Sequence, residues 1–392
     1  MTDEILIVGG GFAGFWAAMA ARRVAGDKAR VTMVSREPVL QMRPRLYEAN
    51  PETLGVDLLP LLDAAGVSFT QGETMGLDLT GRTVTLASGA TLPFDRLVVA
   101  TGSTVRRPPV PGAEAAYSID SQQDAIVFDR RLQEIARDVA RPTIAIVGAG
   151  FTGIELTLEL RDRIAAHGGE AKNLRIVLID RAAAVGSELG AGPRSEIEAA
   201  LAAAAVECRL GETVTALAAD RMTFASGPAL DTDAVVLTTG MIASGFVRHV
   251  PGERDPLGRI VVDSSLRAPA APEVFVTGDA AAADTGNGHP SLQSCQHALQ
   301  LGRFAGENAA RDLLSLPTVP YAQPRYVTCL DLGRSGAVLT QGWDRTVSKT
   351  GDEAKALKRR INRVVIYPPA NAPGATLLAL SSIDPAEQRL PG

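Results

Sequence analysis

The stretch ILIVGGGFAGFWAAMAARR, residues 5–23, opens with branched apolar residues, breaks into glycines and continues with residues that favour helices. This order predicts a strand, a glycine turn and a helix. In its G-x-G-x-x-G motif, Gly9 permits the tight turn, Gly11 lets backbone N–H groups approach a pyrophosphate, and Gly14 lets the helix pack close to the strand. The positive end of the helix dipole then faces the phosphates. The stretch therefore predicts a dinucleotide-binding unit.

A second copy of the motif lies in TIAIVGAGFTGIELTLELRDR, residues 143–163, where Gly148, Gly150 and Gly153 again follow a β-rich run. A single G-x-G-x-x-G motif is weak evidence, whereas two copies in the strand–turn–helix context are strong evidence. The chain is therefore expected to bind two dinucleotides.

The two motifs belong to a longer internal repeat, because residues 67–102 resemble residues 206–240. Equivalent glycines keep an almost constant offset, which is 139 for Gly9 and Gly148, 139 for Gly72 and Gly211, and 138 for Gly102 and Gly240. Each half reads as a βαβ unit, a short meander and an apolar strand that ends in Thr-Gly. The strand ends are Ala100, Thr101 and Gly102 in the first half and Gly240 in the second. We predict an α/β protein with two Rossmann-like domains.

The composition is that of a globular enzyme of two or three domains. The chain has 392 residues, of which 46% are hydrophobic and 21% charged, and its formal net charge is −5. This balance gives no basic field that would recruit nucleic acid. The first predicted strand begins almost at Met1, which leaves no room for a signal peptide, and no apolar run reaches membrane-spanning length. We expect a cytoplasmic protein.

The three cysteines, Cys208, Cys295 and Cys329, are widely spaced and contain no C-x-x-C pair. This pattern fits neither a disulfide framework nor a zinc site, and no metal site is expected. The simplest interpretation is that they are small, reduced core residues.

A third strand-then-glycine turn occurs at Thr277-Gly278-Asp279, within VFVTGDAAA. Together with the two glycine motifs and the first Ala-Thr-Gly, it makes residues 4–310 resemble the two-dinucleotide flavoprotein reductases. In that family the first unit binds FAD, the second binds NAD(P)H, and the aspartate that matches Asp279 bonds the ribityl chain of the flavin. The resemblance implies an FAD domain at 1–115 and 241–317, an NAD(P)H domain at 116–240 and a C-terminal interface domain at 318–392.

Within this superfamily the chain resembles the type II NADH dehydrogenases. Its segment 44–49, Pro-Arg-Leu-Tyr-Glu-Ala, is similar to a segment that packs along the flavin in that family, and Arg43 directly precedes it. We count Arg43 among the cofactor-binding candidates. GIELTLEL is similar to the family's GVELAGEL, so the resemblance implies that Glu155 is the acid beside the nicotinamide.

The same family follows its GDA motif with a helix that reads A-Q-x-A-x-Q, and this chain has Cys295 to Gln300 in that register. Gln296 and Gln300 are four residues apart, so they are neighbours on one helix face. Neutral amides can donate to quinone carbonyls without burying a charge. The resemblance implies that both glutamines line a quinone site, while His297 points elsewhere on the helix.

In each dinucleotide-binding unit, the residue at the end of the second strand indicates how the nucleotide ribose is bound. The first unit has Ser35 where an acid is expected, so Ser35 or Glu37 would bond the FAD ribose. The second unit has Asp180, which is placed to accept from the ribose hydroxyls of NADH. Arg181 follows it and could instead hold a 2′-phosphate, so NADH is favoured and NADPH is the alternative.

The cysteines and the surface charge bear on other functions found in the superfamily. No cysteine precedes Cys208, which excludes the disulfide reductases and the single-cysteine peroxide and coenzyme A disulfide reductases. Convergence of Cys295 and Cys329 would favour a sulfide:quinone oxidoreductase. A charged docking patch would favour a reductase of a ferredoxin-type partner, and slow turnover would favour a binding protein that senses flavin and NADH.

The pattern changes after Pro317, where residues 321–347 alternate like strands and 353–367 read as a helix. The last 25 residues are rich in Pro, Ala and Gly and do not look like the amphipathic membrane helices of the family. The preceding helix carries basic residues on both sides, which favours a solvated element or a dimer surface over membrane attachment. They are Lys355, Lys358, Arg359, Arg360 and Arg363. We expect a monomer or homodimer that takes NADH and a quinone-like acceptor.

Overall fold

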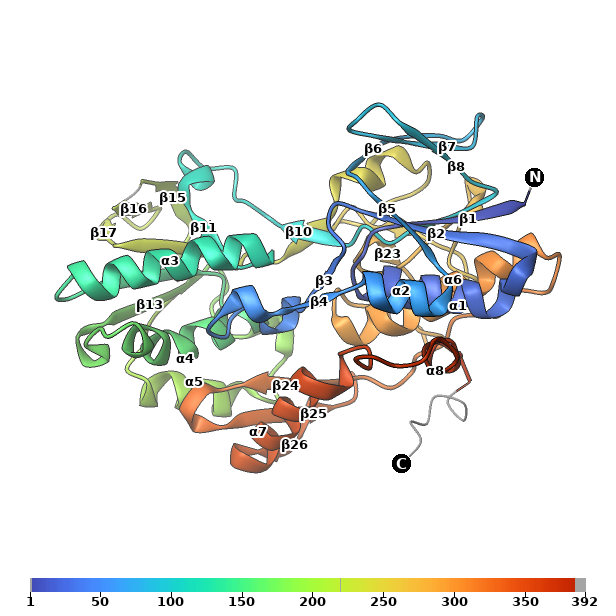
Figure 1. The fold of residues 1–392 in the computed structure, drawn as a ribbon. Helices are drawn as coiled ribbons and strands as arrows, with labels where there is room; N and C mark the ends of the chain where they lie inside the picture. Colours follow the sequence, from blue (N-terminus) through green and yellow to red (C-terminus); the bar gives the residue numbers. More distant parts are fainter. Residues whose placement is uncertain (1, 219, 385–392) are drawn as a thin grey trace.

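The computed structural model describes residues 2–218 and 220–384, which form two lobes with a smaller unit beneath them (Figure 1). The first lobe is built on a sheet with the strand order β21-β22-β9-β1-β2-β5, in which neighbours run parallel except for the pair β21–β22. These strands are β1 (Asp3–Val8), β2 (Ala29–Ser35), β5 (Ser68–Gln71), β9 (Arg96–Val99), β21 (Arg267–Ala268) and β22 (Ala271–Val276). The parallel order confirms the expected α/β fold.

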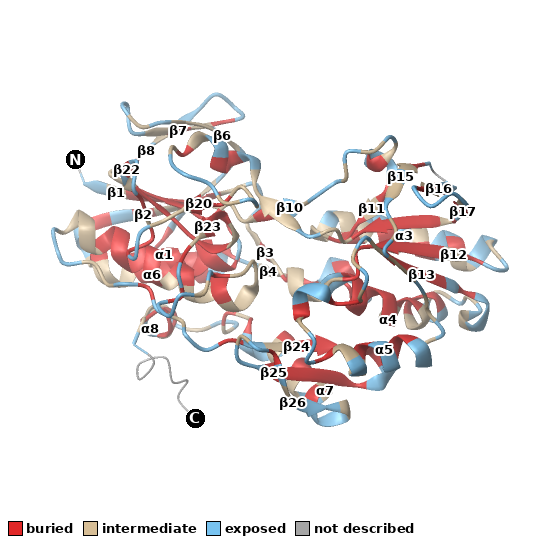
Figure 2. Cartoon of the chain, turned by 180° about the vertical axis from the view of Figure 1, so that it is seen from behind, coloured by how far each residue is buried: buried red, intermediate tan, exposed pale blue. Residues whose placement is uncertain are grey.

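Strand β1 is buried on both faces, as its unbroken apolar sequence predicts. Ile5 and Ile7 belong to the core that contains α1 (Phe12–Ala25) and α6 (Cys295–Leu313). Leu6 and Val8 belong to a second core shared with the meander β6 (Thr74–Asp78), β7 (Thr83–Leu86) and β8 (Thr91–Pro93). Figure 2 shows α1 and α6 as buried helices under the sheet.

The second lobe repeats this plan, as the internal repeat predicts. Its sheet has the all-parallel order β11-β18-β12-β13-β14, and an antiparallel meander again follows. The strands are β11 (Tyr117–Ser118), β12 (Thr143–Val147), β13 (Arg175–Asp180), β14 (Glu207–Leu210), β18 (Ala234–Leu237) and, in the meander, β15 (Val214–Leu217), β16 (Arg221–Phe224) and β17 (Leu230–Asp231). Its helices are α3 (Gln122–Asp138), α4 (Phe151–Ala166) and α5 (Arg194–Ala203).

The chain crosses between the lobes at two adjacent strands. β10 (Ser103–Val105) leaves the first Thr-Gly turn and pairs antiparallel with β19 (Met241–Ala243), which leaves the second. The loop after β2, where β3 (Val39–Gln41) pairs with β4 (Gly55–Asp57), leads to α2 (Leu59–Ala65). This loop contacts the second lobe, because Gln122 of α3 donates from its N–H to Gln41 and from its side chain to the Pro51 carbonyl. The paired strands β10 and β19 therefore join the lobes that carry the two glycine turns. We propose the domain boundaries given above on this basis.

The C-terminal unit is a three-stranded antiparallel sheet followed by helices, as the alternating pattern after Pro317 predicts. It comprises β24 (Val327–Asp331), β25 (Ala337–Gln341), β26 (Thr346–Thr350), α7 (Gly351–Arg360), a π-helical turn at Ile361–Val365 and α8 (Gly374–Leu380). Of the last 25 residues, 385–392 lie outside the described residues. Among the described residues, no helix combines the length and apolar character needed to cross a membrane.

The expectation that the basic helix is simply solvated is wrong for two of its residues. Lys358 is buried, and Lys355 is half-buried and paired with Asp331. Arg359 and Arg360 are exposed, so α7 has a charged outer face and two lysines that point inward. A buried lysine needs a carboxylate partner, because an unpaired charge in an apolar interior is costly.

Candidate active site

The first glycine turn has the geometry of a phosphate cradle. Gly9 has a φ of +115°, which side chains rarely tolerate, and Gly11, the N-cap of α1, has extended backbone. A Cβ added at Gly14 would overlap the carbonyl oxygen of Gly9, so only glycine allows this close packing. A Cβ at Gly11 would meet no other atom within 4 Å. The N–H groups of this helix end therefore face a space that can receive a diphosphate.

The third glycine turn brings a carboxylate to the same sheet edge. Asp279 follows β22 and accepts a hydrogen bond from the Ser103 hydroxyl at 2.6 Å. Arg43 lies beside it, with Nη1 3.9 Å from Asp279 and 3.3 Å from Ser103, and its guanidinium also pairs with Asp120. The sequence candidates Arg43 and Asp279 thus lie side by side, as polar groups suited to hydroxyls of a bound cofactor.

The remaining candidates of the first unit lie at strand ends. Ser35 ends β2, and a Cβ at Gly10 would lie 2.9 Å from its hydroxyl oxygen. Ala100 and Thr101 follow β9, and the Thr101 hydroxyl accepts from Ser244 at 2.6 Å. In the turns that end the apolar strands, Gly102 has a φ of +67°, Gly240 of +70° and Gly278 of +63°.

The second glycine turn has nearly the same backbone conformation as the first. Gly148 has the same φ of +115° as Gly9, and a Cβ at Gly153 would overlap the Gly148 carbonyl. Asp180, at the end of β13, accepts from the N–H of Ala149 at 2.6 Å. One difference stands out, because the exposed Glu188 carboxylate lies over Gly150 and accepts from the N–H of Phe151 at 3.1 Å.

Glu155 lies on the buried face of α4, one turn after the second glycine motif. Its carboxylate is 2.8 Å from Lys358 Nζ of α7 and accepts from the N–H of Asp331 at 2.8 Å. Burial raises the pKa of Glu155 to about 7, although Lys358 and the Asp331 N–H oppose the rise. Burial disfavours the charge of Lys358, yet the Glu155 carboxylate holds the pKa of this lysine above its ordinary value.

This ion pair is the centre of a larger polar network between the lobes and the C-terminal unit. The Tyr47 hydroxyl donates to Asp331 at 3.2 Å and accepts from Asn362 at 3.3 Å. Lys355 pairs with Asp331 and lies 3.8 Å from Glu159. Burial and the charge of Asp331 raise the pKa of Glu159 to about 7. Two carboxyl groups of this network therefore titrate near neutral pH.

Helix α6 carries the two candidate glutamines on its first turns. Gln296 and Gln300 are both half-buried, and their side-chain amides make no hydrogen bond within the described part of the chain. His297 points away from them into the protein, where its Nδ1 meets the Ser294 hydroxyl at 3.0 Å and its ring stacks on Tyr326. Burial lowers the pKa of His297 to about 4, which keeps the ring neutral. This placement agrees with a structural role for His297.

The cysteines differ in their surroundings. Cys208 lies on the edge strand β14 and is exposed, so the expectation that it is a core residue is wrong. Cys329 is buried and Cys295 half-buried, and both thiols interact with Lys358. Burial raises the pKa of Cys295 and raises that of Cys329 to about 11, so neither thiol favours the reactive thiolate. All three are free thiols.

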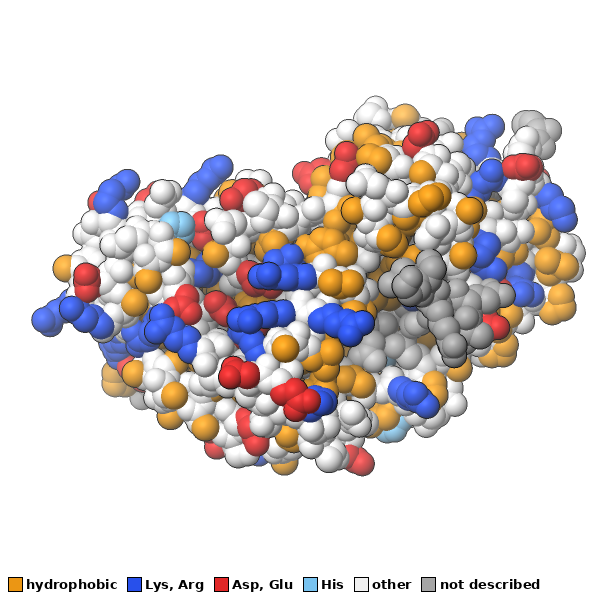
Figure 3. Space-filling model, turned by 60° about the horizontal axis from the view of Figure 1, so that its bottom comes forward, with side chains coloured by type: hydrophobic (Ala, Val, Ile, Leu, Met, Phe, Trp, Pro, Cys, Tyr) orange, Lys and Arg blue, Asp and Glu red, His pale blue; other side chains and the backbone are white. Residues whose placement is uncertain are grey.

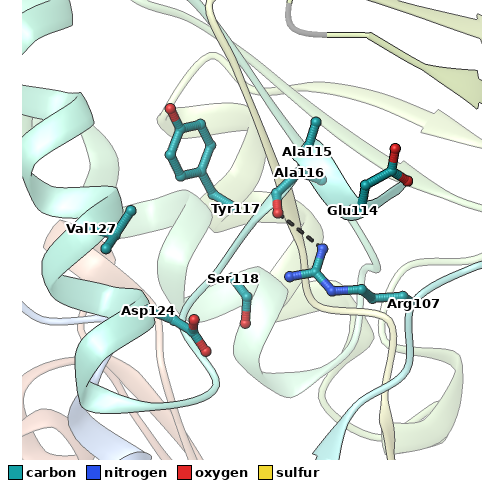
Figure 4. A pocket seen from close by; sticks show the side chains of 8 residues that line it. All are labelled: Arg107, Glu114, Ala115, Ala116, Tyr117, Ser118, Asp124 and Val127. Atoms are coloured by element: carbon teal, nitrogen blue, oxygen red, sulfur yellow. Dashed lines mark hydrogen bonds between the residues drawn. The ribbon is translucent and has the colours of Figure 1, made fainter. Parts of the chain in front are cut away.

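A cavity of about 230 Å³ lies elsewhere, on the edge strand β11 of the second lobe (Figure 4). Its lining includes Tyr117, Glu114 and Asp124, and the Arg107 guanidinium beside them donates to the backbone carbonyls of Ala113 and Ala116. It contains none of the candidate residues named above. Among the described residues, no group of three or more His, Cys, Asp or Glu could hold a metal ion.

Comparison with known proteins agrees with this architecture. Residues 3–302 match the model of the pyridine nucleotide-disulphide oxidoreductase family. The chain belongs to this family. An NADH dehydrogenase-like protein of Mycobacterium tuberculosis is 40% identical over 97% of this chain and 98% of its own length. The demethylphylloquinone reductase of Synechocystis is 27% identical over 87% of this chain and 88% of its own length.

Solved structures of this oxidoreductase family share the fold. NDH2 from Plasmodium falciparum, solved in complex with NADH, has a TM-score of 0.79 at 12% identity and covers 97% of both chains. The sulfide:quinone oxidoreductase of Aquifex aeolicus has a TM-score of 0.75 at 19% identity, over 92% of this chain and 90% of its own. The chain is thus an NAD(P)H-dependent flavoprotein oxidoreductase by family, and its acceptor has to be argued from the site.

Sequence reasoning missed Lys358, Asp331 and Glu188 as site residues. Lys358 and Asp331 belong to the C-terminal unit and reach Glu155 only through tertiary packing. Glu188 lies in a loop after β13 whose path local sequence does not determine. A usable signal was the spacing of Lys355 and Lys358, which places both on one helix face.

Proposed function

We propose that this chain is an FAD-dependent oxidoreductase that takes electrons from NADH and passes two of them to a quinone-like acceptor. The names of its relatives support this proposal, since they include NADH dehydrogenase-like proteins, a demethylphylloquinone reductase and a type II NADH:quinone oxidoreductase of Mycobacterium tuberculosis. The soluble ferredoxin reductase and the sulfide:quinone oxidoreductase are alternatives within the same fold.

The first unit fits FAD. The Gly11 end of α1 would receive the diphosphate, Ser35 a ribose hydroxyl, and Arg43 and Asp279 the chain that links the diphosphate to the ring. Bound FAD would accept a hydride from NADH and deliver two electrons to the acceptor. The protein would hold FAD, NADH and the acceptor in place and would supply or remove protons.

The buried network around Glu155 is the observation that carries the quinone proposal. NADH supplies a hydride, so reducing a quinone to a quinol requires one further proton from solvent. Glu155, with a pKa of about 7, and the neighbouring Lys358 and Tyr47 can hold and pass such a proton near neutral pH. Reducing a ferredoxin releases one proton to solvent for each NADH, whereas reducing a quinone consumes one, so the quinone, unlike the ferredoxin, needs a proton donor.

Surface charge gives the ferredoxin alternative no support on the face that includes the C-terminal unit. There, acidic side chains lie among the Lys and Arg side chains, and apolar groups separate them (Figure 3). An electrostatically steered protein partner would favour a patch of one sign. The raised pKa of Cys295 and of Cys329 likewise argues against persulfide chemistry at these thiols.

The function is tested by an acceptor screen with purified, FAD-loaded protein. NADH consumption would be measured with a water-soluble ubiquinone, a menaquinone analogue, a ferredoxin, a disulfide and sulfide plus quinone. We expect quinones to sustain turnover at rates at least about tenfold above the other acceptors, because the Gln296 and Gln300 amides can donate to quinone carbonyls and the Glu155 network can supply the proton that a quinol requires. Faster turnover with the ferredoxin would reject the proposal.

Replacing Gln296 or Gln300 by Ala should slow reoxidation by quinone while flavin reduction by NADH stays nearly unchanged. Losing one neutral hydrogen bond costs about 0.5–1.5 kcal/mol and more if a buried group is left unpaired, so we expect roughly a three- to thirtyfold effect. Stopped-flow absorbance separates the two half-reactions. Gln341→Ala, on the exposed end of β25, is the matched control. Unchanged reoxidation in both variants would place the acceptor elsewhere.

Asp180 should make NADH the better nucleotide by at least about tenfold in kcat/KM, because its carboxylate would repel a 2′-phosphate. Two unit charges at 4 Å repel by about 4 kcal/mol at an effective dielectric constant of 20. This repulsion is larger than a tenfold preference requires. Asp180→Asn keeps an acceptor for the Ala149 N–H and should narrow the preference. Steady-state assays with NADH and NADPH measure this preference in the wild type and in the variant. A wild-type preference for NADPH would assign the specificity to Arg181 instead.

A further inference from the structure

Glu188 lies at the position that the second glycine motif would offer to a diphosphate. A Cβ added at Gly150 would lie 3.1 Å from the Glu188 carboxyl carbon and 3.5 Å from its Oε2, so the carboxylate rests directly on the turn. Its Oε1 accepts from the N–H of Phe151, the first residue of α4. At the first glycine motif, a Cβ added to the equivalent Gly11 would meet no other atom within 4 Å. The two turns therefore match in backbone and differ in this one side chain.

A carboxylate and a diphosphate cannot share this helix end. Both are anions that accept from the same N–H groups, and both are favoured by the positive end of the α4 dipole. The nucleotide must therefore displace Glu188 or bind against its charge. Glu188 is exposed and follows Gly186, which has a φ of +58°, so its side chain can move without disturbing the core.

Arg345 offers the displaced carboxylate a new partner. It lies in the hairpin between β25 and β26 and packs on the loop that carries Glu188, with its Cγ 3.7 Å from the Cβ position of Gly190. The residue is 9% exposed, and its Nη1 is buried and donates no hydrogen bond to any described residue. Its guanidinium lies 4.4 Å from the Tyr326 ring centroid.

The charges of Arg345 and Glu188 act in opposite directions on the pKa of Tyr326. Burial raises the pKa of Tyr326, the Arg345 charge opposes that rise, and the Glu188 charge adds to it. Arg345 Nη1 has no hydrogen-bond partner in the described part of the chain, while the Glu188 carboxylate is held by the Phe151 N–H. Arg345 packs on Gly190, two residues after Glu188, so a Glu188 side chain that leaves Phe151 stays on the loop against which this arginine lies.

We propose that Glu188 and Arg345 set the affinity for the pyridine nucleotide by an exchange of partners. The diphosphate displaces the Glu188 carboxylate from the α4 N-terminus, and Arg345 then pairs with that carboxylate. The proposal rests on the proposed function only in assigning a pyridine nucleotide to this turn. Both are positioning residues, because neither contacts the reacting atoms.

The test is calorimetric binding of ADP-ribose to the FAD-loaded protein, which needs no turnover. Glu188→Gln removes the competing charge and should lower the Kd for ADP-ribose by roughly three- to tenfold. Adenosine, which has no phosphate, should bind both proteins equally. Glu198→Gln removes the same charge from the exposed face of α5 and should leave the ADP-ribose Kd unchanged. An unchanged or higher Kd in Glu188→Gln overturns the proposal.

A double-mutant cycle tests the role of Arg345. Arg345→Met should raise the Kd for ADP-ribose by roughly three- to tenfold in the wild-type background and by less than about twofold when Glu188 is already Gln. An Arg345 effect that persists in the Glu188→Gln background would mean that Arg345 acts on the nucleotide or on the fold, and would overturn the exchange.

The two proposals fail in different ways. If ADP-ribose binds neither the wild type nor Glu188→Gln, the assignment of a pyridine nucleotide to this turn fails, and the exchange fails with it. If ADP-ribose binds and the cycle shows no coupling, only the exchange fails. Because Glu188 is exposed, its single variant remains informative even if Arg345→Met proves unstable.

Discussion

Glu155→Gln is expected to lower the free energy of unfolding by about 3–5 kcal/mol at pH 8, because it leaves Lys358 buried without its counter-charge. The side chains of the pair are 3% and 6% exposed, so water cannot replace the lost partner. Lys358→Met should cost a similar amount, since it leaves Glu155 unpaired. Denaturant unfolding followed by circular dichroism measures both, with the FAD content held constant.

Two variants control this prediction. Asp162→Asn breaks an exposed pair between the same helix α4 and Arg334 of the C-terminal unit, and should cost less than about 1 kcal/mol. The double variant Glu155→Gln with Lys358→Met removes both charges and should recover most of the loss. If Glu155→Gln costs no more than Asp162→Asn, the ion pair does not hold the C-terminal unit in place.

The same variants distinguish the effect of Glu155 on stability from its proposed role in proton transfer. The pKa of Glu155 is about 7 in the folded protein and 4.5 in its ordinary state, so between these values folding takes up a proton. Protonation of Glu155 therefore favours folding most below pH 4.5, and this effect is lost as the pH rises through about 7. At pH 8 Glu155 is ionised, and its remaining contribution is the ion pair with Lys358. Glu155→Gln should flatten this slope in part, since Glu159 titrates in the same range. The stable double variant should still reoxidise slowly with quinone.

The sequence was sufficient for those parts of the fold whose cause is local. A glycine turn between a strand and a helix needs only a few consecutive residues, which is why Gly9 and Gly148 take the same φ in the predicted places. The parallel sheets and the meanders followed from the repeat. The resemblance implied a flavin contact for Asp279, whereas its proximity to Arg43 comes from the fold, since the residues lie far apart in the chain.

The features that the sequence did not predict depend on packing between distant segments. Lys358 reads as one basic residue among several, and only the fold shows that it faces Glu155 while Arg359 faces solvent. Cys208 sits on a strand that was predicted, but its exposure depends on β14 being the sheet edge. Charge pattern along a helix thus identifies an element, whereas the partner of each charge is a tertiary property.

The close contact between α1 and α6 is one place where a single methyl group should have a large effect. A Cβ at Gly306 would overlap the backbone carbonyl of Ala17, and one at Gly302 would overlap that of Ala13. A backbone carbonyl cannot rotate aside as a side chain does, so the helices would have to separate. Because α1 and α6 begin at the proposed diphosphate and acceptor sites, their separation would move both sites apart.

We expect Gly306→Ala to lower the free energy of unfolding by about 2–3 kcal/mol, which is in the upper range of overpacking costs. This loss would come despite a gain of about 1 kcal/mol in helix propensity, so its sign distinguishes packing from propensity. Gly306→Val should go further and yield protein with a reduced FAD content, measured as the ratio of flavin to protein absorbance. A stabilised Gly306→Ala would show instead that the two helices can move apart freely, and the acceptor face of α6 would then not be held in register with the phosphate-binding end of α1.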